Sequence, residues 1–249
     1  MAEHGLPLLA VVLLWFASTG LVLWLDSRPP STFGRSLGWA GAAAIVGALL
    51  LAATVDRADI AAAYAGFVAA LAIWGWHELS FLTGVVAGPN RTPCPPGLRG
   101  WARFRAATAT LIHHEIALAL TAVLLLALSW GRANPTGAIA FALMFGLRLS
   151  AKLNLFVGVP AFADEMMPPR LAYLRSYFGT ASVNLLLPLS LLGCLGAAVW
   201  FAVVAVGAED GAAAGATMLF ALAVLGAIEH LFLVLPFREA VLWRWARDD

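Results

Sequence analysis

Charged residues and cysteines are scarce in this sequence of 249 residues. Only 12% of the residues are charged, about half the share of a typical soluble domain, whereas 62% are hydrophobic. A soluble fold of this composition would expose large apolar patches to water, so the composition indicates helices embedded in a membrane. The net charge of +1 offers no basis for nucleic-acid binding. The two cysteines, Cys94 and Cys194, lack the spacing of a metal knuckle, and no disulfide is expected between them.

Several functional signatures are also missing. The one lysine, Lys152, lies in the fifth apolar segment, so the seventh segment has none to form a retinal Schiff base. The sequence contains no Gly-rich phosphate loop, kinase signature or Ser-His-Asp order. The first apolar segment lacks the basic start and small-residue cleavage motif of a signal peptide, so it is expected to remain as a membrane span.

Long apolar runs are what the sequence does contain. A membrane helix needs about 20 largely apolar residues, because ~30 Å of hydrocarbon is crossed at ~1.5 Å per residue. Seven segments meet this requirement: 6–25, 37–55, 60–87, 106–130, 135–157, 183–207 and 214–241. The sequence therefore predicts an all-α, polytopic membrane helix bundle that forms one transmembrane domain.

The arginines are distributed unevenly between the two sides of these spans. One side holds only Arg57 and Arg132, whereas the side that carries the C-terminus holds eleven arginines: Arg28, Arg35, Arg91, Arg99, Arg103, Arg105, Arg170, Arg175, Arg238, Arg244 and Arg247. Positively charged loops stay in the cytoplasm. The distribution predicts an N-terminus outside and a C-terminus in the cytoplasm.

The segment 168–178 is predicted to form a short helix on the cytoplasmic membrane surface. Two prolines suit a helix start, and three apolar residues follow at helical spacing: Pro168, Pro169, Leu171, Leu174 and Phe178. Two interpretations stay open for it, an ordered loop and a docking surface for a partner. The basic loop 91–105 is either part of the same docking face or only an orientation signal.

Ionisable and polar residues occur inside four of the spans. They are His77 and Glu78; His113, His114 and Glu115; Arg148, Lys152 and Asn154; and Glu229 and His230. An ionisable residue near the bilayer centre costs about 2.5–3.5 kcal/mol or more. Counted from the segment ends, His77, the group His113–Glu115, Arg148 and Glu229 lie roughly 11–18 Å from the cytoplasmic side. This agreement in depth predicts one buried polar cluster.

Three interpretations of this cluster stay open. In the first, the glutamates pair with Arg148, Lys152 and the histidines, and the pairs fix the helices in register. In the second, imidazoles and carboxylates bind a metal ion or the metal of a tetrapyrrole. In the third, His and Glu side chains relay protons or ions. Because neighbouring residues point about 100° apart on a helix, one member of each His-Glu pair at most faces a shared centre.

Several stretches resemble a known family in their order and spacing. They are Trp76–Gly84, the loop Pro89–Gly97, the pair His114-Glu115, Asn154–Pro160, Glu165, Pro168, Leu171–Phe178 and Asn184. Together they resemble the PuhE family of photosynthetic complex assembly proteins from phototrophic bacteria. The resemblance covers nearly the whole chain and is clearest from the third span to the seventh.

This resemblance implies a multi-pass protein of the bacterial inner membrane, whose N-terminus the arginine distribution places in the periplasm. It implies a role in assembling the reaction-centre and light-harvesting complex and an influence on bacteriochlorophyll production. The expected partners are membrane lipid and photosynthetic complex subunits or pigment-synthesis proteins. The resemblance carries over no catalytic residue and does not favour an enzyme.

The polar cluster supplies the candidate site residues for this role. The candidate ligands of a bacteriochlorophyll are His77, His113, His114 and His230. The candidate ligands of a divalent metal are His77, Glu78, His114, Glu115, Glu229 and His230, and the polar partners are Arg148, Lys152 and Asn154. Two alternative functions stay open: a membrane metal-dependent enzyme acting on a tetrapyrrole or another lipid-soluble substrate, and a proton-coupled transporter.

Overall fold

The structure is a computed structural model that describes residues 1–160, 167–181, 184–235 and 239–246. Within these residues the long elements are all helices: α1 (Gly5–Ser27), α2 (Phe33–Thr54), α3 (Ile60–Leu82), α5 (Ile112–Ser129), α6 (Thr136–Val157), α7 (Leu186–Gly207) and α8 (Asp210–Phe232). All seven are long and apolar enough to cross a membrane. The predicted fold class is confirmed, and the protein is a multi-pass membrane protein.

The described residues also contain four shorter helices. They are η1 (Pro30–Thr32), α4 (Gly100–Thr108), η3 (Pro169–Tyr177) and η4 (Glu239–Ala246). The predicted surface helix 168–178 corresponds to η3, which has 3₁₀ rather than α geometry. Glu165 and residues 182–183 lie outside the described residues.

The third, fourth and seventh helices have ends that differ from the predicted spans. The third stops at Leu82 instead of residue 87, because Gly84 adopts φ 77°, a left-handed conformation that ends a helix. The fourth begins at Ile112, after the separate helix α4, and the seventh covers Asp210–Phe232 instead of 214–241. The predicted spans had included residues 83–87, 109–111 and 233–235, which do not continue these helices.

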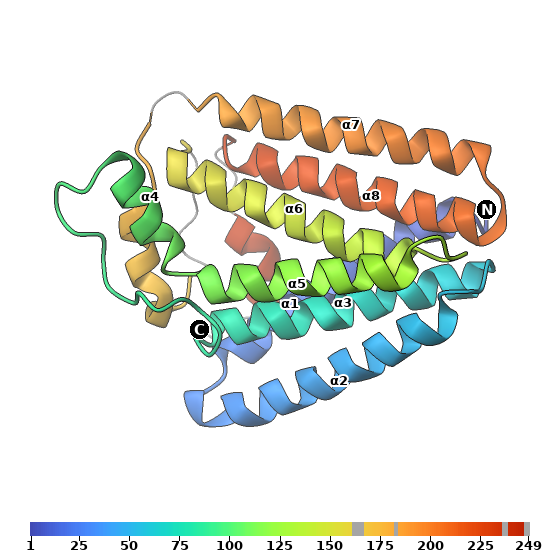
Figure 1. Ribbon diagram of the computed structural model, residues 1–249, viewed down its shortest axis with the longest axis horizontal. Coiled ribbons are helices and arrows are strands. Elements are labelled where there is room, and N and C mark those ends of the chain that lie inside the picture. Colours follow the sequence, from blue (N-terminus) through green and yellow to red (C-terminus); the bar gives the residue numbers. More distant parts are fainter. Residues whose placement is uncertain (161–166, 182–183, 236–238, 247–249) are drawn as a thin grey trace.

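The long helices run side by side, and the N-terminus and the end of α8 lie at opposite ends of the bundle (Figure 1), as an odd number of spans requires. The most deeply buried span is α8, which contacts α1, α3, α6 and α7. On opposite sides of the bundle, α7 packs along α8 and α2 packs along α3. The outer faces of α2 and α7 expose large apolar side chains such as Ile45, Leu49, Leu192 and Val203, as contact with lipid requires.

Helices α3 and α6 approach each other at two glycines. A Cβ atom on Gly137 would lie 2.9 Å from the side chain of Leu51 and still closer to the backbone carbonyl of Gly66. Small residues let membrane helices pack this closely, and dispersion contacts then stabilise the pair. The crossing fixes the mutual position of the two helices that carry Glu78 and Arg148.

Gly137→Ala is expected to destabilise the protein by about 1–3 kcal/mol, because the new methyl group would push α6 away from the backbone of α3. The measurement is thermal unfolding of the purified protein in detergent. Gly146→Ala is the matched control on the same helix, because a Cβ atom there meets nothing within 4 Å. Equal melting temperatures of the two variants would show that the helices are not in close contact at Gly137.

The end of the bundle that holds the N-terminus carries the two isolated arginines, and both are paired. Arg57 contacts Asp59 at 2.9 Å, and Arg132 contacts Asp56 at 2.9 Å. Hydrogen bonds from Arg57 hold the pKa of the exposed Asp59 carboxyl below its usual value. The pairing removes positive charge from this end, in keeping with the predicted orientation, which remains a prediction from the charge distribution.

The other end of the bundle is covered by η3, α4 and the loop between α3 and α4 (Figure 1). Arg170 of η3 donates to the carbonyl oxygen of Leu82 at 2.6 Å and pairs with the carboxylate of Asp26. Its guanidinium also lies 4.6 Å from the ring centre of Phe33. These contacts hold η3 against the ends of α1, α2 and α3.

Candidate functional site

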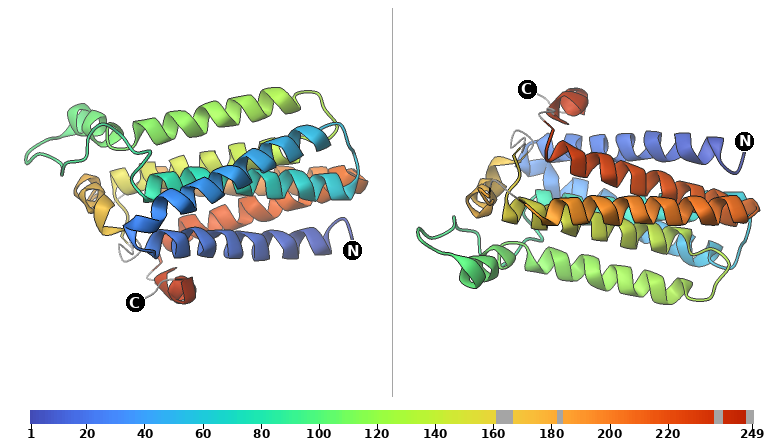
Figure 2. Two further views of the ribbon diagram at one scale, coloured as in Figure 1. Left: turned by 90° about the horizontal axis from the view of Figure 1, so that it is seen from below. Right: turned by 90° about the horizontal axis from the view of Figure 1, so that it is seen from above.

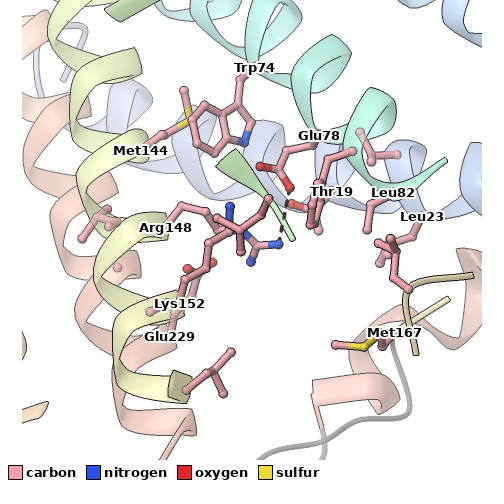
Figure 3. A pocket seen from close by; sticks show the side chains of 18 of the residues that line it. Thr19, Leu23, Trp74, Glu78, Leu82, Met144, Arg148, Lys152, Met167 and Glu229 are labelled. Atoms are coloured by element: carbon pink, nitrogen blue, oxygen red, sulfur yellow. Dashed lines mark hydrogen bonds and ion pairs between the residues drawn. The ribbon is translucent and has the colours of Figure 1, made fainter. Parts of the chain in front are cut away.

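A cavity of about 430 Å³ lies inside the bundle, between α1, α3, α6 and α8. Each of these helices contributes residues spaced three and four apart, which lie on one helical face. The lining residues in the spans are Trp15, Ser18, Thr19, Val22 and Leu23 of α1; Leu71, Trp74, Gly75, Glu78, Phe81 and Leu82 of α3; Met144, Leu147, Arg148, Ala151, Lys152, Leu155 and Phe156 of α6; and Leu222, Leu225, Gly226, Glu229 and Phe232 of α8. Figure 3 shows several of them around the space.

The cavity extends along much of one membrane leaflet. On α8 it is lined from Leu222 to Phe232, a helix rise of about 15 Å. At the predicted cytoplasmic end it is lined by Leu171, Leu174 and Tyr177 of η3. At the side, Trp243 of η4 lines it and stacks on Phe16 of α1 with ring centres 4.7 Å apart. In Figure 2, η4 lies against α1, outside the bundle of long helices.

Ionisable side chains from three helices meet beside this cavity. Arg148 of α6 contacts Glu78 of α3 at 3.4 Å, the ion pair drawn as a dashed line in Figure 3. Lys152, one turn further along α6, contacts Glu115 of α5 at 2.5 Å. The second carboxylate oxygen of Glu78 lies 3.7 Å from Nε2 of His114. We call Glu78, His114, Glu115, Arg148 and Lys152 the charged cluster.

Burial within the charged cluster is uneven. The side chains of Glu78 and Glu115 are 11% exposed and that of Lys152 is 16% exposed, whereas that of Arg148 is 46% exposed. Buried charges persist only when they are paired and hydrogen-bonded, because leaving water costs several kcal/mol per ion. The pairing that this cost requires is present for Glu78, Glu115 and Lys152.

The glutamates of α3, α5 and α8 lie nearer the helix ends than the predicted spans implied. Glu78 is four residues before the end of α3, Glu115 is three residues after the start of α5, and Glu229 of α8 is three residues before its end. These separations amount to about 5–6 Å of helix rise. Only Arg148, nine residues before the end of α6, keeps its expected depth of ~14 Å.

The four candidate histidines do not meet at one point. His114 is fully buried, stacks on Phe81 with ring centres 4.6 Å apart, and contacts Glu78. His77 lies one position before Glu78, and its Nε2 instead lies 3.0 Å from the hydroxyl of Thr121 on α5. His113 is exposed on the surface of α5. None of the histidines in the described part of the chain lines the cavity.

His230 belongs to a second polar group, between α6, α7 and α8. Its Nδ1 donates to the carbonyl oxygen of Gly226 at 2.7 Å, and its Nε2 lies 2.9 Å from the hydroxyl of Ser150. Asn154 donates to Ser190 of α7 at 2.9 Å and accepts from Asn184 at 2.9 Å. These hydrogen bonds join α6, α7 and α8.

A metal ion would need several of these donors within one coordination sphere. Among residues 1–160, 167–181, 184–235 and 239–246, no group of three or more His, Cys, Asp or Glu side chains is placed to hold one. The proposed ligand set His77, Glu78, His114, Glu115, Glu229 and His230 is instead divided among separate contacts. Glu78 and Glu229 are the two of these six that line the cavity.

The contacts that hold η3 at this end of the cavity were not predicted from the sequence. Arg103 of α4 donates to the carbonyl oxygen of Tyr177 at 2.6 Å and lies 4.4 Å from the ring centre of Phe156. The hydroxyl of Tyr177 accepts from Asn90 at 2.8 Å and donates to the carbonyl oxygen of Thr92 at 3.2 Å. The aromatic and basic residues of η3 and α4 were visible in the sequence, but their partners lie about 70 to 90 positions away.

Tyr177→Phe is expected to destabilise this end of the protein by about 1 kcal/mol, because two hydrogen bonds are lost. The nearby Cys94, whose backbone N–H donates to Ser176 at 2.7 Å, reports the change through its rate of alkylation by a maleimide. That rate is expected to rise severalfold, while Cys194 stays protected by its burial.

Tyr173→Phe is the matched control, because the buried hydroxyl of Tyr173 has no hydrogen-bond partner in the described structure. Removing this hydroxyl is expected to leave the alkylation rate of Cys94 unchanged. A faster reaction in Tyr173→Phe than in Tyr177→Phe would contradict the assigned contacts.

The fold and the site define a class: a helical membrane protein of seven spans with a charged cavity inside the bundle. The whole chain, residues 1–249, matches the model of a family described as "Protein of unknown function (DUF3623)". The chain belongs to this family.

One curated relative comes from Rhodobacter capsulatus and is described as an "Uncharacterized 30.4 kDa protein in puhA 5'region". It is 37% identical over 255 residues, covering 98% of this chain and 91% of the relative. No solved structure matches the chain.

Proposed function

We propose that this protein is an assembly factor for the photosynthetic reaction-centre and light-harvesting complex of a bacterial inner membrane. In this role it holds a lipid-soluble component, bacteriochlorophyll or a precursor of it, in the cavity while the complex is built. The observation that carries the proposal is a cavity of about 430 Å³ inside a membrane-embedded bundle, with charged groups in the middle of an otherwise largely apolar wall. Pockets of roughly 300–1,000 Å³ accommodate one drug-sized ligand.

The genetic position of the relative supports the photosynthetic part of the proposal. The description of the relative locates it in the 5′ region of puhA in Rhodobacter capsulatus, a phototrophic bacterium. The two sequences are 37% identical over nearly their full lengths, so a shared role is the simplest expectation for this chain.

The apolar part of the cavity suits a ring system or chain. Trp74, Met144, Leu225 and Phe232 supply aromatic, thioether and branched surfaces. An axial ligand for a chlorophyll magnesium would have to face this space, and Glu78 and Glu229 are the metal-ligand candidates that do. The proposed pigment contact therefore depends on packing and on these carboxylates more than on the histidines.

The experiment that tests the role is deletion of the gene in a phototrophic host, followed by near-infrared absorption spectra of its membranes. The proposal predicts a severalfold loss of assembled reaction-centre and light-harvesting absorbance, restored by the wild-type gene on a plasmid. Unchanged spectra and unchanged phototrophic growth would contradict the assembly role.

The cytoplasmic contacts with client subunits form a second part of the proposal. The surface of η3 and α4, with the exposed Trp101, Arg99 and Arg105, is the part of the described chain that extends beyond the long helices (Figure 1). In the deletion host, Trp101→Ala is expected to weaken co-purification of complex subunits, while the cavity remains unchanged. Equal co-purification of complex subunits with Trp101→Ala and with the wild type would show that this surface does not contact them.

A further inference from the structure

Helix η4 lies outside the bundle of long helices, yet it contributes to the inner wall of the cavity. It packs against α1 (Figure 2), and its residues Leu242 and Trp243 line the cavity. The side chain of Trp243 is buried, with only 3% of its surface exposed. An element outside the bundle can line an inner space only where the long helices leave a gap. The wall of long helices is therefore incomplete beside α1.

Aromatic rings fasten η4 over this gap. Trp243 stacks on Phe16 of α1 with ring centres 4.7 Å apart and meets the ring of Trp15 edge-on at 5.5 Å. The ring of Trp245 lies 5.6 Å from that of Phe16 and covers Gly20, where an added Cβ atom would overlap it. Offset and edge-to-face arrangements of this kind are the favourable ones for aromatic pairs. The position of η4 thus depends on a few side chains.

The gap lies at the depth of the hydrocarbon. Trp15 is twelve residues and Gly20 seven residues before Ser27, the last residue of α1. These separations amount to about 10–18 Å of helix rise, within the ~30 Å of a bilayer core. Trp245 packs at this depth and is 60% exposed, so its ring contacts lipid rather than water. The gap beside α1 therefore faces the bilayer, in the half toward the predicted cytoplasmic end.

We infer that this gap is a lateral portal, closed by Trp243, through which an uncharged lipid-soluble molecule enters the cavity from the bilayer. Such a molecule keeps its apolar surface out of water along this route. A charged molecule is excluded, because an ion is costly to move into hydrocarbon. The inference rests on the proposed function only in taking the cavity as the site of a lipid-soluble ligand.

The test measures how fast a lipid-soluble reagent, N-(1-pyrenyl)maleimide, labels a cysteine placed in the cavity. Gly75→Cys supplies the thiol, because Gly75 lines the cavity and an added Cβ atom there meets only Val22, at 3.8 Å. The full chain is purified into lipid nanodiscs and carries Cys94→Ser, which removes the less buried native thiol. Labelling of the buried Cys194 is subtracted by using the same chain without Gly75→Cys.

Trp243→Ala is expected to raise the labelling rate of this thiol severalfold, because it removes the ring that closes the portal. Gly20→Leu leaves Trp243 in place but displaces the ring of Trp245, so it is expected to raise the rate as well. Trp200→Ala is the matched control at a tryptophan of α7 that is 67% exposed, and it is expected to be labelled as the wild type is. Equal rates in the wild type, Trp243→Ala and Gly20→Leu would overturn the inference.

A water-soluble sulfonated maleimide distinguishes entry from the bilayer from entry through the cytoplasmic end. It is expected to label the Gly75→Cys thiol slowly and at the same rate with and without Trp243→Ala. Equal acceleration of both reagents by Trp243→Ala would show a loosened bundle and reject the portal. A portal that passes these tests, in a protein whose deletion leaves the host spectra unchanged, would retain the entry route and reject the assembly role.

Discussion

Lys152→Met is expected to destabilise the protein by about 3–5 kcal/mol, because it leaves the Glu115 carboxylate buried without a cation. The Glu115–Lys152 contact is 2.5 Å long, and the two side chains are 11% and 16% exposed. Removing one member of such a pair costs far more than removing both, since the remaining charge has lost its water and its partner. The expected fall in melting temperature is roughly 6–20 °C.

The double variant Glu115→Gln/Lys152→Met is expected to recover most of this loss. Arg132→Met serves as the control for an exposed pair, because Arg132 and Asp56 are 50% and 66% exposed. Exposed pairs contribute about 0–1 kcal/mol, so the control is expected to melt close to the wild type. A double variant no more stable than Lys152→Met would show that the two residues do not pair.

Gly75→Leu is expected to abolish assembly of the photosynthetic complex while leaving the protein folded. Gly75 lines the cavity on α3, and a Cβ atom there would meet only the side chain of Val22, at 3.8 Å. A leucine would therefore extend into the space that the proposed ligand occupies, without pushing helices apart. Membranes of the deletion host that carries this variant are expected to match the deletion in their near-infrared absorbance.

Gly193→Leu is the matched substitution on α7, outside the cavity, where a Cβ atom meets nothing within 4 Å. It is expected to restore absorbance as the wild-type gene does. If the Gly75→Leu variant fully restored the absorbance and was present in the membrane in a normal amount, the cavity would not be needed for assembly.

The fold was largely predictable from the sequence, because it depends mainly on where long apolar runs occur along the chain. Apolar runs of about 20 residues identify membrane helices without reference to their partners. Helix ends were less predictable, since the stop at Leu82 depends on the left-handed conformation of Gly84, and Val85 to Ala87 would be equally apolar in a helix or a loop. The beginning of η4 was merged with the last span for the same reason, although the helix ends at Phe232.

The candidate site was predicted in part. The predicted polar cluster included Glu78, Glu115, Arg148 and Lys152, and the structure pairs Glu78 with Arg148 and Glu115 with Lys152. Depth carries no information on rotation about the helix axis, which directs His77 toward Thr121 and His230 toward Ser150. The interpretation of the glutamates as partners of Arg148 and Lys152 is therefore the one that the observed contacts match most closely.

The cavity itself was not predicted, although the sequence contained a signal for it. On α1 the lining residues Trp15, Ser18, Thr19 and Val22 follow helical spacing, but they include no charge that would distinguish them from a lipid-facing stripe. A cavity depends on which faces oppose each other and on the volumes they fail to fill, and both are properties of the assembled bundle.

The most direct measurement is an electron cryo-microscopy map of the full chain in a lipid nanodisc prepared from a phototrophic host. The account predicts the contacts of Arg148 with Glu78 and of Lys152 with Glu115, and non-protein density in the cavity. A closed bundle without this cavity, or one in which Arg148 points into the surrounding lipid, would contradict it.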